Sequence, residues 1–178
     1  MAKLPWVYWD SCTWIAYINQ EKSVVQQDGS IENRFVKCLE VLDQANNKKL
    51  EIVTSAFTLA EVCKSPEVRQ SPLDNLPAFF EKSYILIVPV DMSIGRRAQI
   101  MQLSGLVSLK PPDSIHLASA IRAKVAELHT FDKGILKLDG LVPGADGKPI
   151  KICKPSEGLP LGPLFEGEKS DTESEDTA

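Results

Sequence analysis

The sequence predicts an α/β fold in which helices cover both faces of a central, mainly parallel sheet of four to five strands. Short apolar runs rich in β-favouring residues alternate along the chain with longer segments of helical periodicity. The runs are apolar throughout, as in strands that are buried on both faces. With 178 residues, 43% of them hydrophobic, the chain is long enough for one domain with a substantial core. We therefore expect a single three-layer α/β/α domain.

The first half of the chain begins with a strand that leads into a helix. Asp10 and Ser11 follow the first apolar run and offer side chains that cap the start of a helix. The elements expected in this half are, in order, a strand at 6–9, a helix at 13–17, a loop at 22–30, a helix with Ile31, Phe35, Cys38, Leu39 and Leu42 on one face, a strand at 50–53 and a helix at 56–63.

The second half of the chain continues the alternation. Proline is favoured in the first turn of a helix, so Pro72 and the pair Pro111-Pro112 mark helix starts. The segment 114–126 is apolar on nearly all sides, as expected of a helix packed deep against a sheet. The elements expected here are a helix from 71 toward 82, a strand at 84–88, a helix at 91–106, a helix at 114–126, a strand at 128–131 and an edge strand at 150–152.

Charge is unevenly distributed along the chain. Residues 157–178 contain seven acidic residues and one lysine, which leaves 19 basic and 17 acidic residues in the first 156, a net charge of +2. The end of the chain is rich in Gly, Pro, Ser and acidic residues and has few apolar ones, so it is not expected to fold on its own. We predict a folded domain over residues 1–153 and a disordered, solubilising acidic tail over residues 154–178.

The rest of the composition is that of a cytoplasmic protein. No stretch approaches the roughly 20 apolar residues of a membrane span, and the N-terminus lacks the layout of a signal peptide, so no membrane association is expected. The four cysteines are widely separated, without a C-x-x-C pair, and mostly have apolar neighbours. We expect them to be reduced, buried thiols.

Four acidic residues stand in four distinctive contexts. Asp10 and Asp132 each follow a short β-rich run, while Glu61 and Asp113 lie on, or at the start of, helical segments. An α/β fold can bring such residues to one edge of the sheet, where ligand sites normally form. Taken singly, each has an ordinary explanation, since Asp10 and Asp113 fit helix caps, Glu61 a helix surface and Asp132 a turn. Their joint occurrence favours a shared site.

Several carboxylates placed close together repel one another unless a cation lies among them. Oxygen ligands favour Mg²⁺ or Mn²⁺ over zinc, and Mg²⁺ typically takes one or two carboxylates directly and reaches others through water. Such a site suits phosphodiester hydrolysis, because the metal activates water and stabilises the charge on the phosphate oxygens. The sequence therefore predicts a metal-dependent hydrolase that acts on nucleic acid.

The four motifs resemble those of the PIN-domain nucleases, and in particular the VapC-type toxin ribonucleases. Four segments show this resemblance: Asp10-Ser11, the segment 55–62 that contains Glu61, the sequence Pro-Asp-Ser-Ile-His-Leu-Ala-Ser-Ala at 112–120, and Thr130-Phe131-Asp132. The resemblance covers roughly residues 5–153. The glycine that usually follows the family's glutamate is absent, since Lys64-Ser65-Pro66 stands there, and the loop 133–148 is long.

The resemblance implies an α/β/α PIN-like fold and an endoribonuclease that uses Mg²⁺ or Mn²⁺. Asp10 and Asp113 would be direct metal ligands, Glu61 and Asp132 would complete the site directly or through water, and Ser11 and Thr130 would orient the carboxylates. It also implies an RNA substrate, a role as the toxin of a toxin–antitoxin pair with an antitoxin partner, and a homodimer.

Other polar and aromatic residues receive structural interpretations. We interpret His116 and His129 as packed histidines, because water activation is assigned to the metal, and Trp6, Trp9 and Trp14 as core residues. The candidate phosphate contacts are Lys64, Arg96, Arg97, Lys110 and Lys133, of which Lys64, Lys110 and Lys133 lie within a few positions of the acids.

Two other functions compete with the nuclease. Phosphoryl transfer through a phospho-aspartate also places an Asp after the first strand, but Cys12 stands where a phosphatase needs a second Asp, and residues 7–9 lack the acidic pair of a receiver domain. The alternative that stays open is a catalytically inactive PIN-like module that binds RNA or protein. Measured metal binding separates it from the nuclease.

Overall fold

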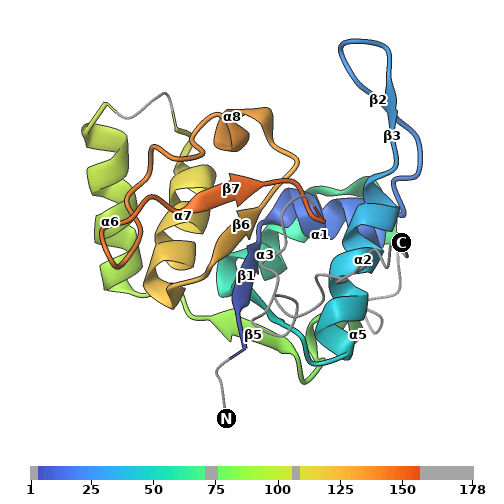
Figure 1. The fold of residues 1–178 in the computed structure, drawn as a ribbon, viewed down its shortest axis with the longest axis horizontal. Coiled ribbons are helices and arrows are strands. Elements are labelled where there is room, and N and C mark those ends of the chain that lie inside the picture. Colours follow the sequence, from blue (N-terminus) through green and yellow to red (C-terminus); the bar gives the residue numbers. More distant parts are fainter. Residues whose placement is uncertain (1–3, 71–75, 106–108, 157–178) are drawn as a thin grey trace, which may run out of the picture.

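A parallel sheet of five strands forms the centre of the molecule, as predicted (Figure 1). The computed structural model describes residues 4–70, 76–105 and 109–156. The strand order across the sheet is β5-β4-β1-β6-β7, and every neighbouring pair is parallel. The strands are β1 (Trp6–Trp9), β4 (Glu51–Ser55), β5 (Ile85–Val88), β6 (Glu127–His129) and β7 (Lys151–Cys153). The predicted edge strand is confirmed as β7.

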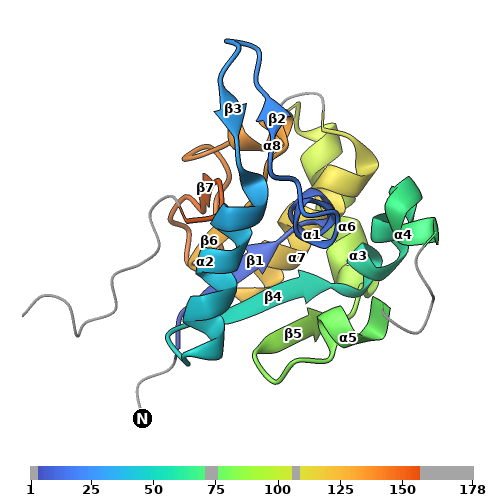
Figure 2. The same cartoon turned by 90° about the vertical axis from the view of Figure 1, so that its right-hand side faces the viewer.

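Helices cover both faces of the sheet, which confirms the three-layer arrangement (Figure 2). Helices α1 and α2 pack on one face and α7 on the other, with α6 against α7. The helical segments are α1 (Ser11–Ile18), α2 (Arg34–Asn46), α3 (Ala56–Glu61), the 3-10 turn η1 (Val62–Lys64), α4 (Pro66–Gln70), α5 (Leu76–Phe80), α6 (Met92–Leu103), α7 (Pro111–Ala123) and α8 (Lys133–Leu136). None of the helices in the described ranges is long and apolar enough to cross a membrane.

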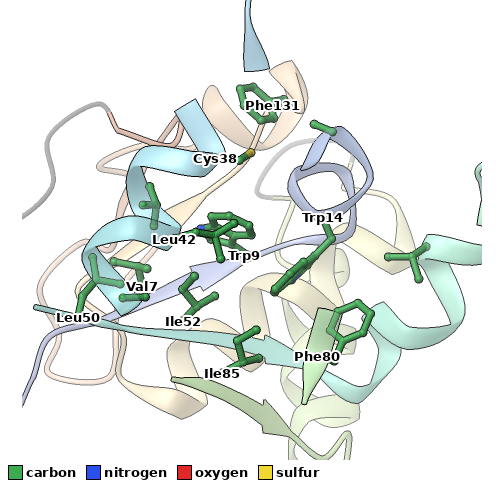
Figure 3. Close-up of a cluster of buried hydrophobic side chains, with 14 residues drawn as sticks. Val7, Trp9, Trp14, Cys38, Leu42, Leu50, Ile52, Phe80, Ile85 and Phe131 are labelled. Carbon is green, nitrogen blue, oxygen red and sulfur yellow. The ribbon is translucent and has the colours of Figure 1, made fainter. Parts of the chain in front are cut away.

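The alternation of side chains along β1 divides the interior into two cores. Val7 and Trp9 point toward α1 and α2, whereas Tyr8 packs on the opposite face with residues of α7. In the first core Trp9 lies edge-on to Trp14 with ring centroids 4.9 Å apart, and Phe80 packs against Trp14 (Figure 3). Both tryptophans are fully buried, so their interpretation as core residues is confirmed.

The segment expected to be a loop at 22–30 contains the first strand and the turn of a small hairpin, which projects from the body (Figure 1). Its strands are β2 (Val24–Val25) and β3 (Ile31–Glu32), which are antiparallel. The positive φ of Gly29, +82°, allows the tight reversal between them. The placement of Ile31 on the buried face of the next helix was therefore wrong. Ile31 is 70% exposed, and α2 begins only after Asn33, whose side chain accepts a hydrogen bond from the Val36 N–H.

Helix α7 begins earlier and ends earlier than the predicted 114–126. Pro111 and Pro112 lie inside its first turn, where a missing N–H costs nothing, and Lys124 ends it in the left-handed conformation. The expectation of buried thiols holds for Cys38 but was wrong for Cys63, which is exposed, and all four cysteines are free. The predicted helix start at 71 and the acidic tail from 157 onward lie outside the described residues.

Candidate active site

The candidate site lies where the chain changes direction across the sheet. From β1 at the centre the chain builds β4 and β5 on one side, and then returns to build β6 and β7 on the other. The carboxyl ends of β1 and β6 therefore flank a topological switch point, where α/β proteins normally bind ligands. Asp10 follows β1 at this point, and Thr130 follows β6.

Asp10 is almost fully buried and is held by several donors. Its Oδ1 accepts a hydrogen bond from the Thr13 N–H at 2.9 Å, so Asp10 is the N-cap of α1. Its Oδ2 accepts a hydrogen bond from the Thr130 hydroxyl at 2.5 Å. The Cys12 Sγ lies 3.1 Å from both oxygens. Burial, followed by the charge of Asp10, raises the pKa of Cys12, which keeps the thiol protonated and able to donate.

The charge of Asp132 acts on Asp113. Thr130, whose hydroxyl serves Asp10, also accepts a hydrogen bond from the Asp132 N–H at 2.9 Å. The Asp132 side chain caps α8 by accepting from the N–H groups of Gly134 and Ile135. Asp113 lies in the first turn of α7, and burial, followed by the charge of Asp132, raises its pKa. Negative charge between these two carboxylates is thus incompletely compensated.

Glu61, the last residue of α3, is 4% exposed and fully occupied by donors. Its Oε2 accepts hydrogen bonds from the Ser11 hydroxyl at 2.8 Å and from His116 Nε2 at 2.7 Å, and its Oε1 pairs with the Lys64 ammonium group. Burial alone would raise the pKa of Glu61, but the hydrogen bonds from His116, Lys64 and Ser11 outweigh it and lower the pKa to about 2. Glu61 is therefore ionised at neutral pH.

These contacts connect Asp10, Asp132 and Glu61, and the charge of Asp132 also acts on Asp113. Asp10 is joined to Asp132 through Thr130, and Ser11, which follows Asp10, binds Glu61. Burial, followed by the charge of Asp132, raises the pKa of Asp113. The acids come from the ends of β1 and β6, from the end of α3 and from the start of α7. The fold thus brings together residues that lie up to 122 positions apart in the sequence.

A second group of polar residues lies on the neighbouring strands β6 and β7. Glu127, His129 and Cys153 place potential metal-ligand atoms within 4.8 Å of one another, and they are the one such group of three among the described residues. Glu127 and His129 alternate along β6, and His129 is the register partner of Cys153 on β7. Lys151, opposite Glu127, donates to its Oε1 at 2.8 Å.

The protonation of His129 argues against a metal at this second group. The Trp9 indole N–H, which can only donate, points at His129 Nδ1 at 3.2 Å, so Nδ1 carries no proton. The proton is then on Nε2, which donates to Glu127 Oε2 at 3.1 Å, and no lone pair is left there for a metal. We interpret Trp9, His129 and Glu127 as a buried hydrogen-bonded network that ends in an ion pair with the exposed Lys151.

Comparison with known proteins then decides the family. The family described as PIN domain matches residues 7–141, which is most of the chain. The chain belongs to the PIN domain family. No curated protein matches it by sequence.

Solved structures share the PIN fold of this chain. VapC20 of Mycobacterium tuberculosis, a toxin that cleaves the sarcin-ricin loop, superimposes with a TM-score of 0.53 at 14% identity, over 72% of this chain and 92% of the toxin chain. A chain from a toxin–antitoxin complex of Klebsiella pneumoniae gives a TM-score of 0.51 at 19% identity, over 76% of this chain and 92% of the other. At these identities the likeness is one of fold.

The donor set of this PIN domain fits a hard divalent cation. The four acids supply carboxylate oxygens, the ligands that Mg²⁺ and Mn²⁺ prefer. The raised pKa of Asp113 reflects burial and the repulsion from Asp132, which a cation between the two carboxylates would relieve.

Sequence reasoning missed part of this site. His116 is 2% exposed and packed, as expected, yet its Nε2 is also bonded to Glu61, and Tyr8 lies 2.9 Å from its Nδ1. The contact of Cys12 with Asp10 was also unforeseen. One signal for His116 was available, because it follows Asp113 by three residues and helical spacing places both on the same side of α7.

The cations predicted to contact phosphate differ in their present partners. Lys64 is paired with Glu61. Lys110 and Lys133 are exposed at the starts of α7 and α8, directly beside Asp113 and Asp132 in sequence. Arg96 and Arg97 are exposed on α6.

Proposed function

We propose that this PIN domain is a metal-dependent endoribonuclease that hydrolyses RNA phosphodiester bonds, and that it is the toxin of a toxin–antitoxin pair. The observation that carries the proposal is the set of acids at the switch point of the sheet, in which burial and then the charge of Asp132 raise the pKa of Asp113. Carboxylates that are partly removed from water and repel one another are costly to retain in a fold unless a cation binds among them.

The roles that we propose follow the contacts at the site. Asp10 and Asp113 hold Mg²⁺ or Mn²⁺ directly, and Glu61 and Asp132 complete the site directly or through water. Ser11 and Thr130 orient Glu61 and Asp10 through the hydrogen bonds described above. When bound, the metal supplies activation of water and stabilisation of charge on the phosphate oxygens.

The proposed substrate is RNA, recognised through its charged backbone and the shape of the cleft. Lys110 and Lys133 are exposed beside the acids and are the proposed phosphate contacts. Lys64 joins them when the metal takes over the neutralisation of Glu61, with which Lys64 is now paired.

The proposed partners are an antitoxin and a second copy of the chain. One surface supports a partner of this kind, since Met92, Ile100 and Leu103 of α6 are 72%, 65% and 79% exposed, and their spacing places them on one side of the helix. Light scattering of the purified protein tests the homodimer, and co-purification with the product of an adjacent reading frame tests the antitoxin.

A calorimetric titration with Mn²⁺ tests the metal site. Wild type is compared with Asp10→Asn, Asp113→Asn and a matched control, Asp43→Asn, whose exposed side chain lies near the end of α2 that leads to the start of β4. We expect binding by wild type and Asp43→Asn and its loss in both site variants. Equal binding by all four proteins would contradict the assigned ligands.

An RNA cleavage assay tests the reaction. Wild type with Mn²⁺ is expected to cut single-stranded or looped RNA internally, and excess EDTA or either site substitution is expected to abolish cutting. If wild type binds RNA without cutting it and binds no Mn²⁺, the protein is instead an inactive PIN-like binding module.

A further inference from the structure

A chain of hydrogen bonds runs from the central strand through α7 to Glu61. The Tyr8 hydroxyl lies 2.9 Å from His116 Nδ1, and His116 Nε2 lies 2.7 Å from Glu61 Oε2. Tyr8 and His116 are buried, and the Tyr8 and His116 rings meet edge-on with centroids 5.9 Å apart. The imidazole therefore has no freedom to turn away from the carboxylate without breaking both contacts.

The direction of these hydrogen bonds follows from the charge of Glu61. A carboxylate that binds a cation is ionised and only accepts, so His116 Nε2 carries a proton and donates a hydrogen bond to Glu61. The Tyr8 hydroxyl lies where it can donate to Nδ1. Tyr8 and Glu61 together hold the imidazole between them.

The same two elements also carry the proposed metal ligands. Asp113 precedes His116 by about one turn of α7. Tyr8 lies in β1, and Asp10 directly follows the end of that strand. A contact from His116 to Glu61 therefore fixes the carboxylate of α3 relative to the elements that present Asp10 and Asp113. Packing alone does not require this contact, because an apolar side chain of similar size would fill the same space.

We propose that His116 is a positioning residue, whose Nε2–H holds the Glu61 carboxylate in the geometry needed for the divalent cation. This inference rests on the proposed metal site and deepens it. Hydrogen-bond partners of metal ligands are typically worth about 10- to 100-fold in metal affinity.

Two substitutions test the two ring nitrogens of His116 separately. In His116→Gln the amide nitrogen can reach the place of Nε2, which keeps the donor to Glu61 and gives up the partner of Tyr8. In His116→Asn the amide reaches only the place of Nδ1, which keeps the partner of Tyr8 and gives up the donor to Glu61. A third variant, Ile121→Val, loses packing in the buried part of α7 without touching the chain of hydrogen bonds.

The experiment measures Mn²⁺ affinity by calorimetry and the unfolding temperature without metal. We expect His116→Gln and Ile121→Val to bind Mn²⁺ with a Kd within about threefold of that of wild type, and His116→Asn to bind Mn²⁺ about 10- to 100-fold more weakly. This order of affinities should not depend on which variant has the lowest unfolding temperature. Equal affinities for His116→Asn and His116→Gln, or affinities that simply follow the unfolding temperatures, would overturn the positioning role while leaving the metal site intact. Absence of Mn²⁺ binding by wild type would overturn the proposed function itself, and the positioning role with it.

Discussion

The Thr130 hydroxyl donates a hydrogen bond to Asp10 Oδ2 at 2.5 Å, between the ends of two neighbouring parallel strands. The same hydroxyl oxygen accepts the Asp132 N–H, so one buried side chain orders the acidic residues that follow both β1 and β6. A hydroxyl is suited to this position because it donates one hydrogen bond and accepts others at the same atom.

Thr130→Val keeps the shape of the side chain and removes both of these hydrogen bonds. We expect the free energy of unfolding to fall by about 1–3 kcal/mol, because buried polar groups lose their partner, and the Kd for Mn²⁺ to rise about 10- to 100-fold. Urea denaturation and calorimetry measure the two effects. Thr130→Ser restores the hydroxyl and is the matched control. A Thr130→Ser protein as impaired as Thr130→Val would show that packing of the methyl group, rather than the hydroxyl, matters here.

Asp113→Asn is expected to change stability in opposite directions with and without metal. A carboxyl whose pKa is raised in the folded state contributes stability at low pH that is lost as the pH rises through that pKa, so ionised Asp113 destabilises the metal-free protein at pH 7. The neutral amide removes this cost. In EDTA, we expect Asp113→Asn to unfold at a higher temperature than wild type.

With Mn²⁺ the order of the two proteins should reverse. At a metal concentration one hundred times its Kd, wild type gains about 2.7 kcal/mol, whereas Asp113→Asn gains much less. Thermal unfolding in EDTA and in Mn²⁺ measures both halves of the prediction. Lower stability of Asp113→Asn in EDTA would show that Asp113 serves the fold, as an ordinary helix-start residue does, rather than a metal.

The sequence predicts the sheet of this PIN domain better than its connections, for a physical reason. The central strands β1, β4 and β6 are almost fully buried on both faces, so burial selects them. The hairpin of β2 and β3 has no such signal. Ile31 looks like part of a helical face, but the Asp28-Gly29 reversal pairs it with Val25, and both side chains remain exposed. Local turn geometry overrides the apolar pattern there.

The acidic residues of the candidate site could be predicted from the sequence, but the contacts between them and their neighbours could not. Asp10 and Asp132 follow strands, and parallel strands end at one edge, so their neighbourhood follows from topology. The hydrogen bond between His116 and Glu61 depends on how α7 packs beside α3, and no residue spacing along the chain predicts that packing. The network of Trp9, His129, Glu127 and Lys151 likewise depends on the register of β1, β6 and β7.

That network predicts a pH dependence of stability. Burial alone would raise the pKa of Glu127, but hydrogen bonds from His129 and Lys151 outweigh it and hold the pKa below its ordinary value. A depressed folded-state pKa contributes stability that is present above the unfolded-state pKa of about 4.3 and is lost as the pH falls through the folded-state value. The network should therefore weaken in acid.

Glu127→Gln tests this dependence directly. We expect it to lower the free energy of unfolding by about 1.5–3 kcal/mol at pH 7, the usual contribution of a hydrogen bond to a charged group. The difference from wild type should shrink steadily below about pH 4. Urea denaturation from pH 7 to pH 3 measures it, with the exposed Glu40→Gln of α2 as control. A difference that stays constant over this range would mean that Glu127 contributes by packing and not by charge.

The proposed phosphate contacts predict a change in the salt dependence of RNA binding. Each lysine that neutralises one phosphate of a single strand adds about 0.7 to the slope of log K against log salt concentration. Binding of a fluorescent single-stranded RNA, measured in EDTA so that the proposed cleavage does not proceed, should show a slope smaller by about 0.7 for Lys110→Ala and for Lys133→Ala. The control is Lys148→Ala, because Lys148 lies in the loop before β7, beside the start of β6 and at the opposite edge of the sheet. If Lys148→Ala lowers the slope as much as the other two substitutions, RNA binds to positive charge anywhere on the surface. It then does not bind specifically along the edge that carries the acids.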